Sequence, residues 1–220
     1  LLIGMFGAIE FSATTMGADG KLQETTLTEN KIQQPIFHTR KITTSVNLRD
    51  GSSVIFGGGE PFTWRHDLLA LCGLAKEMGF FVQVGTNGVA LPNGFESISS
   101  IDRYVLPLES VDRAVHDRAR LYRNRHLEIV MERLERLREA GKSVTISTVV
   151  THETLSGLEA LGRFLQQYRK QGGNLHAWHL YKFIPEGRGG SVHADLGLDE
   201  TSYDQACDAL KNGNLGFTIF

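Results

Sequence analysis

The feature of this sequence that most restricts its fold is a regular alternation of short β-branched runs with amphipathic stretches, which begins near Ser52. The runs predict buried strands, and they recur every ~25–40 residues, the spacing of a strand, a crossover helix and two loops. The six expected strands cover residues 53–56, 80–85, 103–108, 143–150, 175–183 and 216–220.

The stretches between these strands carry apolar residues at helical spacing. In residues 126–140 they share one face, and Gly141 follows as a C-terminal stop signal. Similar stripes predict helices over residues 66–78 and over residues 154–170, and Gly172-Gly173 follow the second of these. A last helix is expected to begin after Asp199, which would be its N-cap. Repeated strand–helix units predict an α/β fold with a parallel sheet, either open and doubly wound or a closed or partial barrel.

The first part of the chain, residues 1–45, has no such pattern. Small polar residues gather in two clusters that suggest loops, and residues 41–48 are a candidate strand. The loop clusters are Ser12, Thr14 and Thr15, and then Thr25, Thr26 and Thr28. We find no tandem repeat or linker, so we expect a single domain over residues 1–220, truncated in mid-element at its C-terminus.

Charge and cysteine content narrow the functional classes. The 220 residues carry a net charge of -2, which argues against a nucleic-acid or anionic-membrane protein that works by bulk charge. No apolar run approaches the ~20 residues that span a bilayer, so we expect no membrane partner. Two cysteines are too few for a disulfide scaffold and favour a reducing, cytoplasmic location.

The most informative motif is Gly57-Gly58-Gly59-Glu60-Pro61, which follows the first expected strand. Three glycines remove every Cβ from the strand end, so a ligand can lie directly against the backbone. Pro61 favours an extended Glu60 and removes one donor. The loop therefore offers carbonyl groups beside a carboxylate, which suits an ammonium-bearing ligand, although a tight strand-to-helix turn is the alternative.

Polar residues also follow the next three expected strands. Thr86-Asn87-Gly88 ends the second, Glu109-Ser110 ends the third, and Thr148 lies near the end of the fourth. Because parallel strands present their carboxyl ends at one edge, we expect these residues to line a common site.

In this order, the segments resemble the radical SAM superfamily. Gly58-Gly59-Glu60-Pro61 is similar to its GGEP motif, and Thr86-Asn87-Gly88 to its T/S-N-G motif. The stretch His116-Asp117-Arg118 also looks like the segment after the fourth strand of many members. The residues 178–190 are more similar to the branch that holds viperin and the molybdenum-cofactor GTP-cyclising enzymes.

The resemblance implies a partial (β/α)6 TIM-like barrel that binds S-adenosylmethionine. It implies that the GGEP backbone receives the methionine ammonium and that later strand ends hold ribose and carboxylate. It further implies a [4Fe–4S] cluster, held by a CxxxCxxC motif, that reduces the sulfonium to give a 5′-deoxyadenosyl radical. The implied cofactor-binding residues are Gly57, Gly58, Gly59, Glu60, Pro61, Thr86, Asn87, Glu109, Ser110 and Thr148. The implied partners are a small-molecule substrate and an electron donor.

The cysteine pattern departs from this family. Residues 1–71 contain no cysteine, and Cys72 and Cys207 each lie on the apolar stripe of an expected helix, so we predict that they are buried and ligate no metal. Three accounts stay open: the cluster segment is replaced or misread in this chain, the protein has lost the cluster, or histidine and carboxylate ligands substitute. The second account makes the chain a cluster-free relative that binds S-adenosylmethionine or a partner without radical chemistry.

Arginines and histidines give further candidates. Arg118 lies in a basic cluster, expected to be a solvated loop, and Arg188 lies between glycines; either could clamp a substrate oxyanion. His176 and His179 are three residues apart on an expected strand, so they face opposite sides and form no joint metal site. Four other histidines are expected to be exposed: His66, His126, His152 and His193.

A reading independent of the resemblance is a barrel hydrolase. Glu60 and Glu109 both follow strands, as paired carboxylates do in glycosidases. Against it, a Gly-Gly-Gly-Glu-Pro turn is an unusual place for a tuned acid, and the chain is too short for eight strand–helix units.

Overall fold

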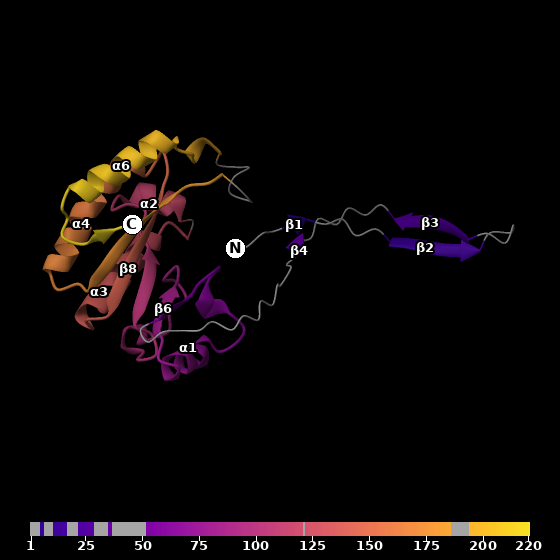
Figure 1. The fold of residues 1–220 in the computed structure, drawn as a ribbon, viewed down its shortest axis with the longest axis horizontal. Helices are drawn as coiled ribbons and strands as arrows, with labels where there is room; N and C mark the ends of the chain where they lie inside the picture. The colour runs from indigo at the N-terminus through magenta and orange to yellow at the C-terminus, as the bar shows by residue number, and fades with distance from the viewer. Residues whose placement is uncertain are drawn as a thin grey trace. The chain divides into compact units, whose positions relative to one another are not determined.

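The computed structural model describes residues 52–120, 122–185 and 194–220, together with four short strands nearer the N-terminus. The chain divides into two compact units, Leu1–Asn47 and Leu48–Phe220. The larger unit, coloured from purple to yellow in Figure 1, carries the candidate site. The single domain expected over residues 1–220 stays a prediction.

Two antiparallel strand pairs occur in the first unit. β1 (Met5–Phe6) pairs with β4 (Pro35–Ile36), and β2 (Phe11–Met16) pairs with β3 (Leu22–Thr28). The loops expected at both threonine clusters are therefore wrong, because β-branched threonine is compatible with strands as well as turns. The candidate strand over residues 41–48 lies outside the described residues.

The second unit is built on six parallel strands in the order β10-β9-β8-β7-β6-β5, so each strand lies beside its neighbours in sequence. The α/β fold of a partial (β/α)6 TIM-like barrel is thereby confirmed, with outer helices covering the sheet (Figure 1). The strands are β5 (Ser53–Phe56), β6 (Phe81–Gly85), β7 (Arg103–Pro107), β8 (Ser143–Val150), β9 (Leu175–Lys182) and β10 (Thr218–Ile219).

Helices connect these strands and begin at capped positions. The Asp67, Asp112 and Asp199 carboxylates each accept a hydrogen bond from the first turn that follows. The helices are α1 (Leu68–Glu77), α2 (Arg113–Ala119), α3 (His126–Glu139), α4 (Leu158–Lys170) and α6 (Glu200–Asn212). Single 3₁₀ turns occupy Pro61–Thr63, Phe95–Ser97, Leu155–Gly157 and Ala194–Leu196. α2 replaces part of the basic segment that the sequence predicted to be a loop.

The two faces of the sheet differ in polarity. Alternate strand residues face the helices and are fully buried, among them Val84, Leu106, Ile146 and Trp178. The residues between them face the concave inner side of the barrel. The register places Ile55, Gln83, Arg103 and Ser143 side by side on that inner face. The helix-facing side thus supplies most of the core, and the inner side carries more of the polar side chains.

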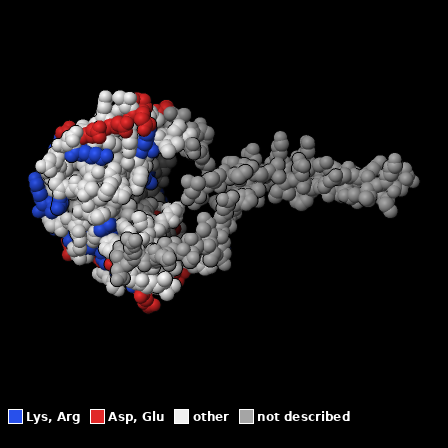
Figure 2. All heavy atoms as spheres, in the orientation of Figure 1, with Lys and Arg blue, Asp and Glu red and all other residues white. Residues whose placement is uncertain are grey.

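Charged side chains of both signs share the surface of the second unit. Figure 2 shows acidic residues gathered over α6, where Glu200, Asp204 and Asp208 lie, and basic residues scattered over the rest of this face. Within the described part of the chain, every helix is too short or too polar to cross a membrane.

Candidate functional site

The loop after β5 exposes bare backbone. Gly57, Gly58 and Gly59 are exposed, and a Cβ added to any of them would meet no atom within 4 Å. Gly58 and Gly59 have φ angles of +95° and +59°, a region that residues with side chains rarely adopt. The open cradle expected from the glycines is therefore present at the strand end.

The Glu60 carboxylate ties this loop to the tip of β6. Its Oε1 accepts from the Thr86 hydroxyl at 2.7 Å and from the Phe62 amide at 3.2 Å, and its Oε2 accepts from the Asn87 amide at 2.7 Å. Both oxygens are thus engaged within the protein. The carboxylate expected beside the carbonyl groups is thus tied to protein donors, and the glycine backbone is the exposed part of the loop.

Other predicted residues complete this edge. The Thr86 hydroxyl also accepts from the Gly88 amide at 3.0 Å, and the Asn87 side-chain oxygen accepts from the Val89 amide at 2.8 Å. These bonds hold the Thr86-Asn87-Gly88 turn in one conformation next to the glycine loop. Pro61, which follows Glu60, is buried and opens the 3₁₀ turn behind the loop.

Glu109 is buried at the end of β7 and is neutralised by an arginine. Its Oε1 accepts from Arg120 Nε at 2.7 Å, and its Oε2 accepts from the Val149 amide on β8 at 2.6 Å. One carboxylate therefore fixes α2 and two neighbouring strand tips in a single arrangement. Because Glu60 and Glu109 both have protein donors on each oxygen, their geometry offers little to a hydrolase mechanism.

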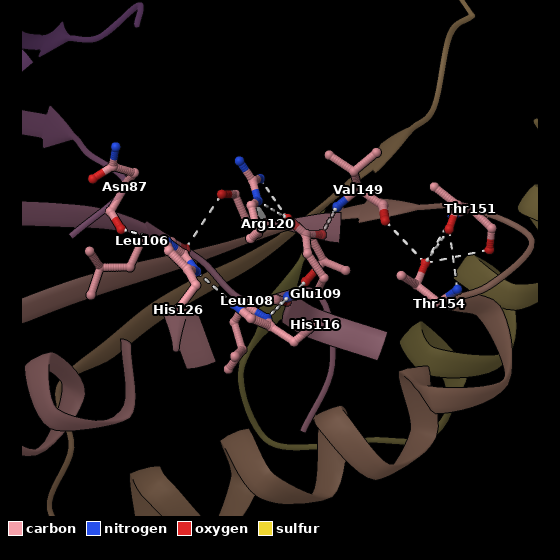
Figure 3. A network of polar contacts seen from close by, with 12 residues as sticks. Asn87, Leu106, Leu108, Glu109, His116, Arg120, His126, Val149, Thr151 and Thr154 are labelled. Carbon is pink, nitrogen blue, oxygen red and sulfur yellow. Dashed lines mark hydrogen bonds and ion pairs between the residues drawn. The ribbon is translucent and has the colours of Figure 1, made fainter. Parts of the chain in front are cut away.

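Two stacked histidines connect the tips of β7 and β6 (Figure 3). The rings of His116 and His126 lie 5.0 Å apart between centroids, and Nε2 of His116 is 2.7 Å from Nδ1 of His126. The Glu109 amide donates to Nδ1 of His116 at 3.1 Å. Nε2 of His126 lies 2.9 Å from the Asn87 carbonyl oxygen.

The partners at the two ends decide the protonation of both rings. A backbone N–H can only donate to His116 and a carbonyl can only accept from His126, so each ring is neutral with its hydrogen on Nε2. Burial, and then the neighbouring His126, lower the pKa of His116 to about 4. Burial also lowers the pKa of His126, which corrects the expectation that this histidine is exposed.

Two predicted cofactor residues are buried behind the edge. The Thr148 hydroxyl donates to the Leu108 carbonyl at 2.6 Å and accepts from Trp178 Nε1 at 2.8 Å, on the helix-facing side of β8. The Ser110 hydroxyl accepts from the Asp112 amide at 3.0 Å at the start of α2. The structure thus brings Ser110 to the strand-end loop and keeps Thr148 inside the core.

Of the two arginines predicted to bind substrate, the structure describes only Arg118. Arg118 forms an ion pair with Glu153 at 2.9 Å, and its side chain is largely exposed. This pair joins α2 to the loop after β8. Arg188 lies outside the described residues, so its role stays a prediction.

Comparison with known proteins decides the family. The sequence pattern of the radical SAM superfamily matches residues 40–165, more than half of the chain. The chain belongs to the radical SAM superfamily. No curated protein matches the sequence significantly.

Solved radical SAM structures share the fold at low identity. A domain of pyruvate-formate lyase-activating enzyme from Bacteroides vulgatus superposes with a TM-score of 0.58 and 16% identity, over 77% of this chain and 98% of that domain. SuiB from Streptococcus suis bound to S-adenosylmethionine gives 0.53 and 14%, and SuiB bound to the precursor peptide SuiA gives 0.52 and 16%. Each of these two alignments covers 76% of this chain. It covers only 38% and 37%, respectively, of the SuiB chains.

The cysteines of this radical SAM protein do not fit a [4Fe–4S] cluster. Cys72 on α1 and Cys207 on α6 are both buried, as predicted, and burial raises the pKa of the Cys72 thiol to about 11. A cluster needs several thiolates on one loop, and the sequence contains only these two cysteines. No group of three or more metal-ligating side chains occurs in residues 52–120, 122–185 and 194–220.

Sequence reasoning missed the histidine connection. His116 and Asp117 were part of the motif that indicated the family, but ten residues separate His116 from His126, and only the turn between α2 and α3 stacks the rings. Asp117 is a second hidden contact, since its Oδ1 accepts from the Leu127 amide at 2.8 Å. No spacing rule links a helix residue to the first residue of the next helix.

Proposed function

We propose that this chain binds S-adenosylmethionine at the carboxyl ends of β5, β6 and β7. The observation that carries the proposal is the open backbone of Gly57, Gly58 and Gly59 beside a turn that Glu60 holds in place. Exposed carbonyl groups are suited to an ammonium group, and a Cβ added to any of these three glycines would meet no atom within 4 Å.

The remaining residues have separate tasks in this proposal. The backbone of residues 57–61 receives the methionine end, and Asn87 lines the neighbouring strand end, while the buried Glu109 and Ser110 hold the next strand end in place for the ribose and carboxylate. Glu60 and Thr86 position the loops without contacting the ligand. Thr148, whose hydroxyl is satisfied inside the core, supports β8 from behind.

The reaction depends on a cluster that these residues do not hold. We propose reductive cleavage of S-adenosylmethionine, with a small-molecule substrate and an electron donor, for a protein in which another segment supplies a [4Fe–4S] cluster. The cofactor then supplies the radical chemistry, and the barrel excludes water. Membership of the viperin and molybdenum-cofactor cyclase branch, and a cytoplasmic location, are part of the same proposal.

The cysteine count favours a second candidate function. With two buried cysteines, the chain as printed has no thiolate to offer an iron–sulfur cluster. It would then be a cluster-free relative that binds S-adenosylmethionine, or a partner, without radical cleavage. Both candidates share the same binding site, so one binding experiment tests their common part.

The test is a calorimetric titration of the chain with S-adenosylmethionine. We compare Gly58→Ala with Gly79→Ala, because both glycines have positive φ (+95° and +84°) and open space around an added Cβ. The two variants therefore carry similar backbone strain, of order 1–3 kcal/mol, but only Gly58 lies in the loop after β5. We expect binding by the wild type and Gly79→Ala, and at least about tenfold weaker binding by Gly58→Ala.

Two results would contradict the proposal. One is the absence of binding heat with the folded wild-type chain. The other is equal affinity of Gly58→Ala and the wild type, which would place the ligand elsewhere.

A further inference from the structure

An arginine occupies the inner face of the barrel at the start of β7. Arg103 Nε donates to the Ser143 hydroxyl at 3.0 Å, and Nη1 donates to the Gln83 side-chain oxygen at 3.3 Å. The guanidinium lies 4.7 Å from the centroid of the Phe81 ring. These contacts fix the group in place and use two of its five N–H donors. The other donors, on Nη1 and Nη2, have no partner among the described residues.

No carboxylate forms an ion pair with this guanidinium in the described part of the chain, although the nearby charge of Asp102 partly offsets the effect of burial on its pKa. The adjacent Asp102 binds Lys76 Nζ at 2.9 and 3.0 Å and the Val82 amide at 2.6 Å. Burial lowers the pKa of Arg103. Burial, and then the Arg103 charge, lower the pKa of His176 and of His179. Among the described residues of this inner face, Arg103 is therefore the one arginine or lysine, and the histidines near it have lowered pKa values.

A row of hydroxyl groups leads from Arg103 toward the strand ends. Ser143, Thr145 and Ser147 alternate along β8 and share its inner face with Arg103. The Thr145 hydroxyl is buried without a hydrogen-bond partner among the described residues, which is costly unless a ligand or water binds it. The inner face is thus polar, with one positive charge at the end where β7 begins.

The edges of this inner face are open, whereas Gln83, Thr145 and Ala177 in its middle are buried. Ile55 on β5, Tyr181 on β9 and Phe220 beside them are 59%, 51% and 61% exposed, although strand alternation and the ring contact of Phe220 with His179 place them on the inner side. Figure 2 shows a recess at the edge of the described surface, below the part that carries α6. Arg103 itself is half-buried, so part of its side chain stays accessible from this open side.

We propose that Arg103 binds a carboxylate group of the substrate, with Ser143 and Thr145 beside it. The inference rests on the proposed function, because it takes the strand ends as the place of reaction. A planar guanidinium that keeps N–H groups on Nη1 and Nη2 can donate to both oxygens of a carboxylate, and one positive charge balances one negative charge. Arg103 and Pro107 are four residues apart on β7, roughly 13 Å. The substrate is therefore elongated, with its reacting carbon roughly 10 Å or more from the carboxylate.

The experiment uses hexanoate as a probe, without S-adenosylmethionine. Side-chain Nε–Hε signals of the arginines are followed by NMR during titration, and the Arg103 signal is identified by its loss in Arg103→Lys. We expect a saturable shift of this signal with a dissociation constant on the order of 1 mM, and little shift with the neutral hexanamide. Arg103→Gln should weaken hexanoate binding at least about tenfold, and Arg163→Gln, an exposed arginine paired with Glu159 on α4, should not.

Three outcomes would overturn the assignment. Hexanamide could shift the Arg103 signal as hexanoate does, Arg103→Gln could retain the affinity for hexanoate, or hexyl phosphate could bind more tightly than hexanoate. A wild-type chain that binds hexanoate but not S-adenosylmethionine would refute the proposed function while leaving the carboxylate site intact. The reverse result would refute the carboxylate site alone.

Discussion

At the scale of single residues, the hydrogen bonds of the Glu60 carboxylate are those whose loss is easiest to interpret. In Glu60→Gln one carboxylate oxygen becomes an NH2 group, so it faces either the Asn87 amide or the Phe62 amide, and two donors meet. An unsatisfied donor of this kind costs about 1–3 kcal/mol. We expect lower unfolding free energy in urea and weaker S-adenosylmethionine binding by calorimetry. Glu159→Gln, on the exposed face of α4, is the control, and equal loss in both variants would refute the role of Glu60.

The histidine pair predicts a pH dependence of stability. The pKa of His116 is about 4 in the folded chain and about 6.5 in the unfolded chain, so the unfolded chain binds more protons between these values. Stability is therefore full above pH 6.5 and is lost as the pH falls toward 4. Asp117 opposes this shift and Arg120 adds to it.

We expect urea unfolding to show a loss of about 2 kcal/mol between pH 7 and pH 5 in the wild type. The loss should shrink by more than half in His116→Leu. His152→Gln, at an exposed position after β8, should keep the full pH dependence. If His116→Leu lost as much unfolding free energy between pH 7 and pH 5 as the wild type does, groups other than His116 would cause the pH dependence.

At the scale of elements, much of the barrel could be predicted from the sequence. Expected and observed bounds agree for β5 and β8, and the Asp199 cap and the stop at Gly141 follow from local chemistry. α2 was missed because its seven residues are mostly charged or small and carry no apolar stripe long enough to detect. The β2–β3 hairpin was missed because threonine fits both loops and strands.

The C-terminal end of α4 illustrates a close contact that periodicity does not reveal. A Cβ on Gly173 would lie 2.2 Å from the Tyr168 ring, which is buried and whose hydroxyl donates to the Leu134 carbonyl at 3.1 Å. The ring cannot move without losing this bond. We expect Gly173→Ala to lower the unfolding free energy by about 1–3 kcal/mol. Gly73→Ala, in α1 with open space around the added Cβ, should raise stability by about 0.5–1 kcal/mol. If Gly173→Ala left the unfolding free energy unchanged, the Tyr168 ring would have to move aside at no cost, contrary to this prediction.

At the scale of the whole molecule, the sequence indicated which strand ends carry the candidate site but not how they are joined. The glycine loop and the Thr86-Asn87-Gly88 turn are visible as motifs, because each needs special backbone. The bonds between them are not visible, because Glu60 reaches Thr86 across 26 residues and Glu109 reaches Val149 across 40. Such contacts depend on strand order, which only the folded barrel supplies.

The last prediction concerns iron. Cluster ligation requires at least three thiolates close together, whereas Cys72 and Cys207 lie on different helices and are buried in the core. We therefore expect anaerobic treatment with iron and sulfide to give no cluster absorption in this chain, and the double variant Cys72→Ala, Cys207→Ala to give the same spectrum. S-adenosylmethionine should still bind, because the glycine loop is formed by the protein alone. Stable cluster absorption in the wild type, retained in the double variant, would require histidine and carboxylate ligands and would overturn this assignment.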